Sequence, residues 1–238
     1  MEIYRFDSIP STNTALAELS KKGAKSWTVI WTSNQTQGKG YAGNEWKTEK
    51  EMNLAFSVLI NSKLTHVELI YFNQWVCNVI HHYLSRFSNE VFIKWPNDII
   101  VRNKKVCGIL IETHKSDNQL NIISGIGLNV NQKDYPGLPK AGSLLTQTGK
   151  AYDIEEILSG LLTEMKNSYH QVENKEWEKI SLNYNRHLFR RDMMSKFIVN
   201  KNEFEGIIKE VDPHGQLIVE DSNGKTISFQ HKEIELIY

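Results

Sequence analysis

Short apolar runs rich in β-branched residues recur along the chain and predict strands. Two of them, residues 28–33 (TVIWTS) and 53–60 (NLAFSVLI), lie in the first quarter of the sequence. Four more follow between residues 91 and 131 with only a few residues between them, namely VFIKWP, DIIVR, KVCGILIETH and QLNIISGIGLNVN. Because a parallel return needs a dozen or more residues, we expect these neighbours to pair antiparallel.

Helical patterns separate and follow these runs. Ser11 begins a polar cap before TALAELSKKG, a short helix that Lys21, Lys22 and Gly23 would close. Thr65 and Glu68 have capping-box spacing and predict a helix that reaches about Phe87. Two further helices are predicted, one from an apolar stripe at 154–165 and one over residues 175–188. The expected fold class is therefore α+β, a mixed, largely antiparallel sheet backed by helices.

The pattern changes after residue 189. The segments MSKFIVN, EFEGIIKEVD, QLIVED and KTISFQ alternate as short strands, with DPHG and SNG as turns. About fifty residues of such strands fit a small SH3-like β-barrel. We therefore expect two domains, residues 1–189 and residues 190–238.

Composition narrows the class of protein. The 238 residues include 28 Lys+Arg against 28 Asp+Glu, and 40% are hydrophobic, which is ordinary for a globular protein. A net charge of zero argues against a protein that coats nucleic acid or an anionic membrane. The N-terminal MEIYRFDSIPSTN has no signal-peptide pattern, and no apolar run approaches the ~20 residues of a membrane span. We expect a cytoplasmic protein with no nucleic-acid or membrane partner.

The cysteines and histidines do not suggest a metal site. Cys77 and Cys107 belong to no paired motif, which predicts buried, reduced thiols; a disulfide between them is the alternative. The only close histidines, His81 and His82, are adjacent in a predicted helix and point about 100° apart. No metal ligand is predicted.

A glycine-rich loop is the first candidate for ligand binding. Residues 38–43 (GKGYAG) satisfy the dinucleotide pattern G-x-G-x-x-G, but Trp46 and another strand follow instead of a helix, so a dinucleotide site is rejected. Exposed backbone N–H groups in such a loop can still bind an anion. A flexible hairpin is the alternative; Lys39 within the loop and Gln35 before it favour a site.

The segment Lys94-Trp95-Pro96-Asn97-Asp98 is the second candidate. Pro96 interrupts the strand ladder, so Asn97 and Asp98 are free to contact a ligand. The next strand starts at Lys105, and a hairpin would bring Lys105 close to Asp98. The alternative is a surface hairpin with an ordinary ion pair of about 0–1 kcal/mol.

The third candidate is the strand that contains Gly125 and Gly127. Glycines that alternate with apolar residues leave bare backbone on one face, where a flat ligand has room. Asn129 and Asn131 share the parity of these glycines and would add amide groups to the same face. Close packing of a helix on the sheet would explain the glycines but not the asparagines.

Taken in chain order, these motifs resemble those of biotin protein ligases, also called biotin–[acetyl-CoA-carboxylase] ligases. The resemblance rests on Ser11-Thr12-Asn13, the Gly38–Gly43 loop with Trp46, KWPND, KVCGILIE and GIGLNVN, and it extends over essentially the whole chain. It implies two steps: biotin and Mg²⁺-ATP give biotinoyl-5′-AMP, and a lysine of a biotin carboxyl carrier domain of a biotin-dependent carboxylase then takes the biotinoyl group. ATP with Mg²⁺ is a co-substrate, and no prosthetic group is implied. Such enzymes are monomers or homodimers.

The resemblance also implies a role for each candidate residue. The catalytic residues would be Lys105, Asp98 and Lys39. Biotin would be held by Ser11, Thr12, Asn13, Gln35, Lys39, Gly40, Tyr41, Lys105, Gly125 and Gly127. ATP would be held by Trp46, Lys94, Asn97, Asn129 and Asn131.

The sequence departs from the family pattern in the loop, which commonly reads G-R-G-R-x-G followed by another Arg. Lys39, Tyr41 and Asn44 stand at these arginine positions, so one of the three keeps a cation.

Only about ten residues precede Ser11, where bifunctional relatives carry a DNA-binding domain, and the monofunctional type is expected. The alternatives are a lipoate–protein ligase-like acyltransferase, whose usual arginine-pair and glycine-triplet stretch is absent from the sequence, and a non-enzymatic small-molecule sensor.

Overall fold

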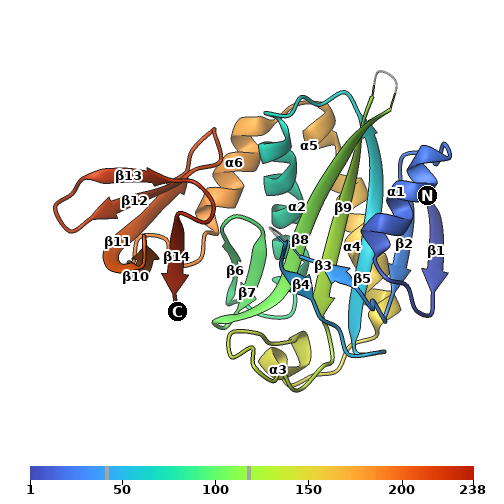
Figure 1. Cartoon of the computed structure of the whole chain (residues 1–238), viewed down its shortest axis with the longest axis horizontal. Coiled ribbons are helices and arrows are strands. Elements are labelled where there is room, and N and C mark those ends of the chain that lie inside the picture. Colours follow the sequence, from blue (N-terminus) through green and yellow to red (C-terminus); the bar gives the residue numbers. More distant parts are fainter. Residues whose placement is uncertain (41–42, 117–118) are drawn as a thin grey trace.

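A seven-stranded mixed sheet forms the centre of the protein (Figure 1). The computed structural model describes residues 1–40, 43–116 and 119–238. The strand order is β1-β2-β5-β9-β8-β7-β6; β1 and β2 are parallel, and every other neighbouring pair is antiparallel. The predicted antiparallel run over residues 91–131 is confirmed. The strands are β1 (Glu2–Phe6), β2 (Thr28–Thr32), β5 (Asn53–Ser62), β6 (Val91–Lys94), β7 (Asp98–Val101), β8 (Lys104–Ser116) and β9 (Gln119–Asn129).

The hydrophobic pattern did not predict β1. This edge strand is exposed along its whole length, so no burial alternation marks it in the sequence. It lies at the outer edge of the sheet in Figure 1, beside β2.

Both faces of the sheet are covered, but differently. Helix α1 (Thr12–Lys21) packs its Leu16 on Ile30, Leu59 and Ile123 on one face. The other face carries the large core, in which β-strand residues pack against α2 (Leu69–Leu84) and α4 (Ile154–Ser168). The remaining helices are α3 (Leu144–Thr148), α5 (His170–Glu173) and α6 (Trp177–Arg186). None of the helices in the described part of the chain is long and apolar enough to cross a membrane.

The N-terminal cap of α1 is the one that the sequence predicted. Ser11 has extended backbone and its hydroxyl accepts a hydrogen bond from Thr14 N. Thr12 and Asn13, which also look like capping residues, instead form the buried first turn of the helix. Their side chains are therefore held rigidly near the sheet, where they take part in the site described below.

The two cysteines are confirmed as free and buried. Cys77 lies in α2 and Cys107 in β8. Burial raises the pKa of both thiols, so neither is activated as a thiolate.

The segment after residue 189 forms a second, antiparallel sheet of five strands in the order β13-β12-β11-β10-β14. The alternating strands predicted there are confirmed; closure into an SH3-like barrel and a domain boundary near residue 189 stay predictions. This sheet meets the first one at the β6–β7 turn, where Trp95 Nε1 donates to Gly215 O at 3.0 Å. Its strands are β10 (Met194–Val199), β11 (Asn202–Val211), β12 (Leu217–Asp221), β13 (Thr226–Phe229) and β14 (Ile234–Ile237).

The start of α2 shows both a confirmation and a correction. Thr65 N and Thr65 Oγ1 donate to the Glu68 carboxylate at 2.8 and 2.9 Å, and Glu68 N donates back to Thr65 Oγ1, which is the predicted capping box. The helix itself begins only at Leu69 and ends at Leu84, not near Phe87. Likewise α6 ends at Arg186, because the following residues pair with β6 through Ile93 N and His187 O at 2.8 Å.

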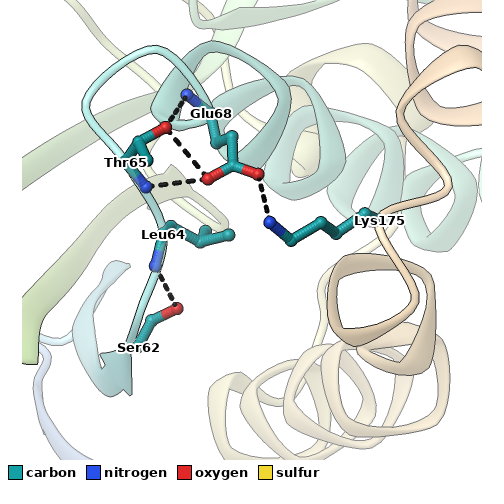
Figure 2. A network of polar contacts seen from close by, with 5 residues as sticks. All are labelled: Ser62, Leu64, Thr65, Glu68 and Lys175. Carbon is teal, nitrogen blue, oxygen red and sulfur yellow. Dashed lines mark hydrogen bonds and ion pairs between the residues drawn. The ribbon is translucent and has the colours of Figure 1, made fainter.

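Glu68 also joins α2 to the segment before α6. Figure 2 shows its carboxylate between Thr65 and Lys175, whose Nζ lies 2.8 Å from Glu68 Oε1. The Glu68 side chain is only 14% exposed. The hydrogen bond from Lys175, together with the Thr65 N–H, lowers the Glu68 pKa from 4.5 to about 2. The ionised carboxylate is therefore favoured by folding.

We expect Glu68→Gln to reduce the free energy of unfolding at pH 7 by about 1–2 kcal/mol, because a charged hydrogen-bond partner is lost. The folded-state pKa is lower than the unfolded one, so this contribution is complete above pH 4.5 and disappears as the pH falls towards about 2. Urea unfolding of both proteins across this pH range measures the difference. Glu18→Gln, which removes an exposed i,i+3 pair with Lys21, is the control and should change stability little. If Glu68→Gln lowered the free energy of unfolding at pH 2 by as much as at pH 7, the stabilising role of the ionised Glu68 carboxylate would be refuted.

Candidate active site

The site begins with small residues on the α1 face of the central sheet. Gly127 pairs with Ala55 on one side and with Gly108 on the other, while Gly125 pairs with Ser57. Directly opposed residues in antiparallel strands share a face, so these positions form one patch with almost no side-chain volume. The patch is continued towards β6 by Asp98, which pairs with both Gly108 and Lys94. The result is a hollow over the middle of the sheet, bordered by charged side chains.

The first turn of α1 closes one end of this hollow. Gln35 Oε1 accepts from Thr12 N at 2.9 Å and lies 3.1 Å from Thr12 Oγ1. Ser57 Oγ lies 2.7 Å from Thr12 Oγ1 and donates to Asn13 Oδ1 at 2.6 Å. Asn13 Nδ2 in turn donates to Glu112 Oε2 at 2.7 Å. Amide, hydroxyl and carboxylate groups from two strands, one helix and one loop thus form a connected network.

Gly125 has to be glycine because Asn13 lies above it. A Cβ at position 125 would fall 2.2 Å from Asn13 Oδ1. In this structure the space over Gly125 is taken by the carboxamide of Asn13 from α1, which is the close helix packing given above as the alternative; room for a flat ligand over this strand stays a prediction.

The glycine-rich loop covers the other end of the hollow. It forms a hairpin of β3 (Gly38–Lys39) and β4 (Glu45–Trp46). The indole of Trp46 lies over the patch, since a Cβ on Gly127 would fall 2.3 Å from its Cε2 and one on Gly108 would fall 3.0 Å from its Cζ3. Trp46 Nε1 is buried and has no hydrogen-bond partner within the described residues. Tyr41, predicted in this loop, lies outside the described residues.

Positive charge gathers at the border formed by β6, β7 and β8. Lys105 Nζ lies 2.7 Å from Asp98 Oδ1 and 5.7 Å from the centre of the Trp46 ring, which confirms the predicted proximity of Lys105 to Asp98. Burial lowers the pKa of Lys94; nearby Asp98 opposes this shift and Lys105 adds to it. A bound anion would offset the unfavourable burial of the Lys94 ammonium. This border is therefore suited to a negatively charged ligand group.

A residue of the second sheet region reaches the same place. His231, between β13 and β14, lines the hollow, and burial followed by the charges of Lys94 and Lys232 lowers its pKa. Sequence reasoning did not associate this histidine with the site.

Most of these groups line one cavity of about 200 Å³, whereas Ser57 and Glu112 lie outside its lining. It brings together most of the residues predicted from the sequence, which are Ser11, Thr12, Asn13, Gln35, Lys39, Gly40, Trp46, Lys94, Asn97, Asp98, Lys105, Gly125 and Gly127. The residues at the cavity that were not predicted as site residues include Glu45, Ala55, Pro96, Gly108, Ile109, Leu110, Ile126 and His231. Five of these residues belong to motifs recognised in the sequence, namely Pro96, Gly108, Ile109, Leu110 and Ile126, whereas Glu45, Ala55 and His231 had no signal there.

Three predicted ATP-binding asparagines are used within the fold. Asn97 Nδ2 donates to Ile109 O at 2.6 Å, although Asn97 also lines the cavity. Asn129 Nδ2 donates to Gly142 O, while its buried Oδ1 has no partner in the described part of the chain. Asn131 is outside the cavity lining and pairs both amide atoms with the backbone of Tyr152. The structure therefore does not bring Asn129 and Asn131 to the cavity.

The arrangement can bind an acid that carries hydrogen-bonding groups at its far end. Asn13 and Trp46 lie close over the glycines and border the cavity, the amides of the α1 turn can hold polar groups, and lysines meet a carboxylate or phosphate at the opposite border. In the part of the chain that the structure describes, no three His, Cys, Asp or Glu side chains gather as a ready-made metal site. Mg²⁺ commonly reaches such sites held mainly by the phosphates of a nucleotide.

Comparison with known proteins agrees with this chemistry. Residues 5–129 match the model of the family described as "Biotin/lipoate A/B protein ligase family". The chain is 25% identical over 232 residues to the "Bifunctional ligase/repressor BirA" of Bacillus spizizenii, a match that covers 93% of this chain and 70% of the relative. It is 27% identical over 224 residues to the "Biotin--[acetyl-CoA-carboxylase] ligase" of Mycobacterium tuberculosis, with 91% and 82% covered.

The fold is likewise shared with a solved structure. "Biotin protein ligase from Aquifex aeolicus in complex with biotin and ATP" superimposes with a TM-score of 0.80 at 24% sequence identity, covering 99% of this chain and 98% of that one. The similarity includes the five-stranded sheet after residue 189, because the match extends over nearly the whole of both chains.

Proposed function

This chain belongs to the biotin/lipoate A/B protein ligase family, and on that basis we propose that it activates biotin with ATP and transfers the biotinoyl group to a lysine of a carrier domain. The observation that carries the proposal is the single cavity in which the glycine floor, the amide network of α1 and the Lys105–Asp98 pair meet. The relatives named above as biotin ligases support biotin as the acid.

In the first step a carboxylate oxygen of biotin attacks the α-phosphorus of ATP. The bond to the β-phosphate breaks, biotinoyl-5′-AMP forms and pyrophosphate leaves. Two anionic groups must approach each other, so the barrier depends on cations that offset their repulsion. Lys105 supplies such a cation from β8, and Asp98 holds its ammonium in place at 2.7 Å. Lys94 and Lys39 line the same cavity and would add positive charge along the phosphates.

Binding of biotin would use the opposite end of the cavity. Ser11, Thr12, Asn13 and Gln35 offer hydroxyl and amide groups to the ureido ring. Gly125 and Gly127 let Asn13 and Trp46 lie close to the sheet, and these two side chains would border the fused rings. Lys39 and Gly40 approach from the glycine-rich hairpin.

The adenosine part would lie near Trp46. Its indole lies over Gly108 and Gly127, and among the described residues its N–H has no hydrogen-bond partner. Asn129 stays a proposed residue of the nucleotide side, because its Oδ1 has no hydrogen-bond partner within the described residues. Mg²⁺ would accompany the ATP phosphates, and Asp98 is a carboxylate that lines the cavity beside Lys105.

In the second step the amine of a carrier lysine attacks the acyl carbon of biotinoyl-5′-AMP. An amide bond forms, the bond from the acyl carbon to the phosphate oxygen breaks, and AMP leaves; the amine gives up a proton. The name of the Mycobacterium tuberculosis relative points to the biotin carboxyl carrier domain of an acetyl-CoA carboxylase as the acceptor.

The test is exchange of radiolabelled pyrophosphate into ATP, measured with biotin, with lipoate or with no acid. We expect exchange that depends on biotin. Exchange with lipoate alone would assign the chain to the lipoate branch of the family, and no exchange with either acid would favour a sensor. Transfer to a purified carrier domain, followed by streptavidin blotting, then tests the second step.

A further inference from the structure

We infer that Glu112 is a positioning residue that fixes the orientation of the Asn13 carboxamide and thereby makes the biotin end of the cavity selective for acids that carry N–H donors. This inference rests on the proposed function, because it concerns how the acid is recognised. Glu112 lies on β8, 99 positions from Asn13 in the sequence, and its carboxylate accepts from Asn13 Nδ2 at 2.7 Å.

A carboxamide can be turned over, which exchanges its donor and its acceptor at little intrinsic cost. Its surroundings therefore decide which way it points. Asn13 is 4% exposed, so water does not compensate for a wrong orientation.

Within the described residues, three groups form hydrogen bonds with the Asn13 carboxamide. Ser57 Oγ is 2.6 Å from Oδ1, but a hydroxyl can donate or accept and would tolerate either orientation. Leu110 O accepts only, yet it is 3.4 Å from Nδ2. Glu112 is the nearest group that can only accept. Turning the carboxamide over would place two oxygens face to face at this distance, so Glu112 decides the orientation.

With this orientation both N–H groups of the Asn13 carboxamide already donate hydrogen bonds within the protein. Nδ2 donates to Glu112 and Leu110, while Oδ1 lies directly over Gly125 at the cavity floor. Asn13 can therefore offer a ligand an acceptor and no donor. The ureido ring of biotin carries two N–H groups that match an acceptor, whereas a dithiolane ring carries none. A site built to accept N–H groups rejects an analogue that lacks them.

Glu112 is not itself placed to react. It is absent from the lining of the cavity that holds Lys105 and Asp98, and it lines a neighbouring hollow together with residues of the glycine-rich hairpin. We therefore expect Glu112 to affect the reaction through Asn13, by changing the binding of the acid and not the binding of ATP.

The experiment compares Glu112→Leu with Glu112→Gln in pyrophosphate exchange, with biotin and ATP varied separately. Glu112→Leu should raise the KM for biotin about tenfold, with the KM for ATP and kcat within about twofold of wild type. Glu112→Gln should stay within about threefold, because its carbonyl oxygen can still accept from Asn13 Nδ2. Glu203→Leu, at an exposed position of β11, is the control and should leave all three constants unchanged.

A second readout separates orientation from general damage. Wild type should discriminate biotin from an N-methylated biotin, in which a ureido N–H is replaced, and Glu112→Leu should lose most of that discrimination. An unchanged KM for biotin in Glu112→Leu, or an equal rise of both KM values without recovery in Glu112→Gln, would overturn the inference. If Glu112→Leu does not fold, Glu112→Ala against Glu112→Gln gives the same comparison. Wild-type protein without biotin-dependent exchange would instead refute the proposed function.

Discussion

Replacing Lys105 with alanine should lower biotin-dependent pyrophosphate exchange by about 10²–10³-fold, the loss typical when a charge-stabilising group is removed from a reacting centre. Lys105 is the lysine that Asp98 holds at 2.7 Å, and its side chain is one-third exposed, so it can reach a ligand without leaving its partner. A weaker effect is expected on transfer from preformed biotinoyl-5′-AMP, because the repulsion between carboxylate and phosphate belongs to the first step.

Two variants separate the charge of Lys105 from its packing. Lys105→Met keeps an unbranched apolar stem near Gly108 and Trp46 and should be about as inactive as Lys105→Ala. Lys115→Ala removes an exposed lysine from the same strand and should retain wild-type exchange. Full activity of Lys105→Met would mean that the ammonium group is not required, and the mechanism proposed above would be wrong.

A second large effect is expected from Gly125→Ala. The new methyl group would lie 2.2 Å from Asn13 Oδ1, so the amide network of α1 has to move. Forcing a group into a packed site costs about 1–3 kcal/mol. At 1.4 kcal/mol per factor of ten, this predicts a KM for biotin raised by about 10–100-fold. Steady-state exchange at varied biotin measures it, and Gly125→Val should raise the KM further.

Gly206→Ala is the matched control for crowding in a strand. A Cβ there would lie 2.6 Å from a Val219 methyl group in the second sheet, so this variant should lose stability to a similar degree. Its KM for biotin should nevertheless stay unchanged. If both variants raise the KM for biotin equally, the effect of Gly125→Ala is a general loss of structure and the placement of biotin beside Asn13 fails.

Much of the fold could be predicted because local patterns determine it. The short spacings between residues 91 and 131 require antiparallel neighbours, and β6 to β9 follow that rule. The Ser11 cap and the apolar stripe of α4 are likewise local features, and both are present. Strand β1 could not be predicted, because an edge strand exposed along its length has no burial pattern to reveal it.

The candidate site could be predicted in part. Motif order and strand parity led to Lys105, Asp98, Gly125 and Gly127, and all four line one cavity. The alternation of side chains along a strand gave a wrong prediction for Asn131. This residue lies beyond the end of β9, where the chain no longer alternates as a strand. There its amide pairs with the backbone of Tyr152.

By itself the sequence determined the elements, their antiparallel neighbours in the central run and the residue types that the chemistry needs. Only the tertiary structure decided which of those residues meet. Strand register placed Ala55, Gly108 and Gly127 side by side across three strands, and the packing of α1 on the sheet brought Asn13 to Glu112. The association of His231 with Lys94 depends on how the second sheet packs. Contacts between residues far apart in sequence follow from register and packing, and neither leaves a local pattern in the sequence.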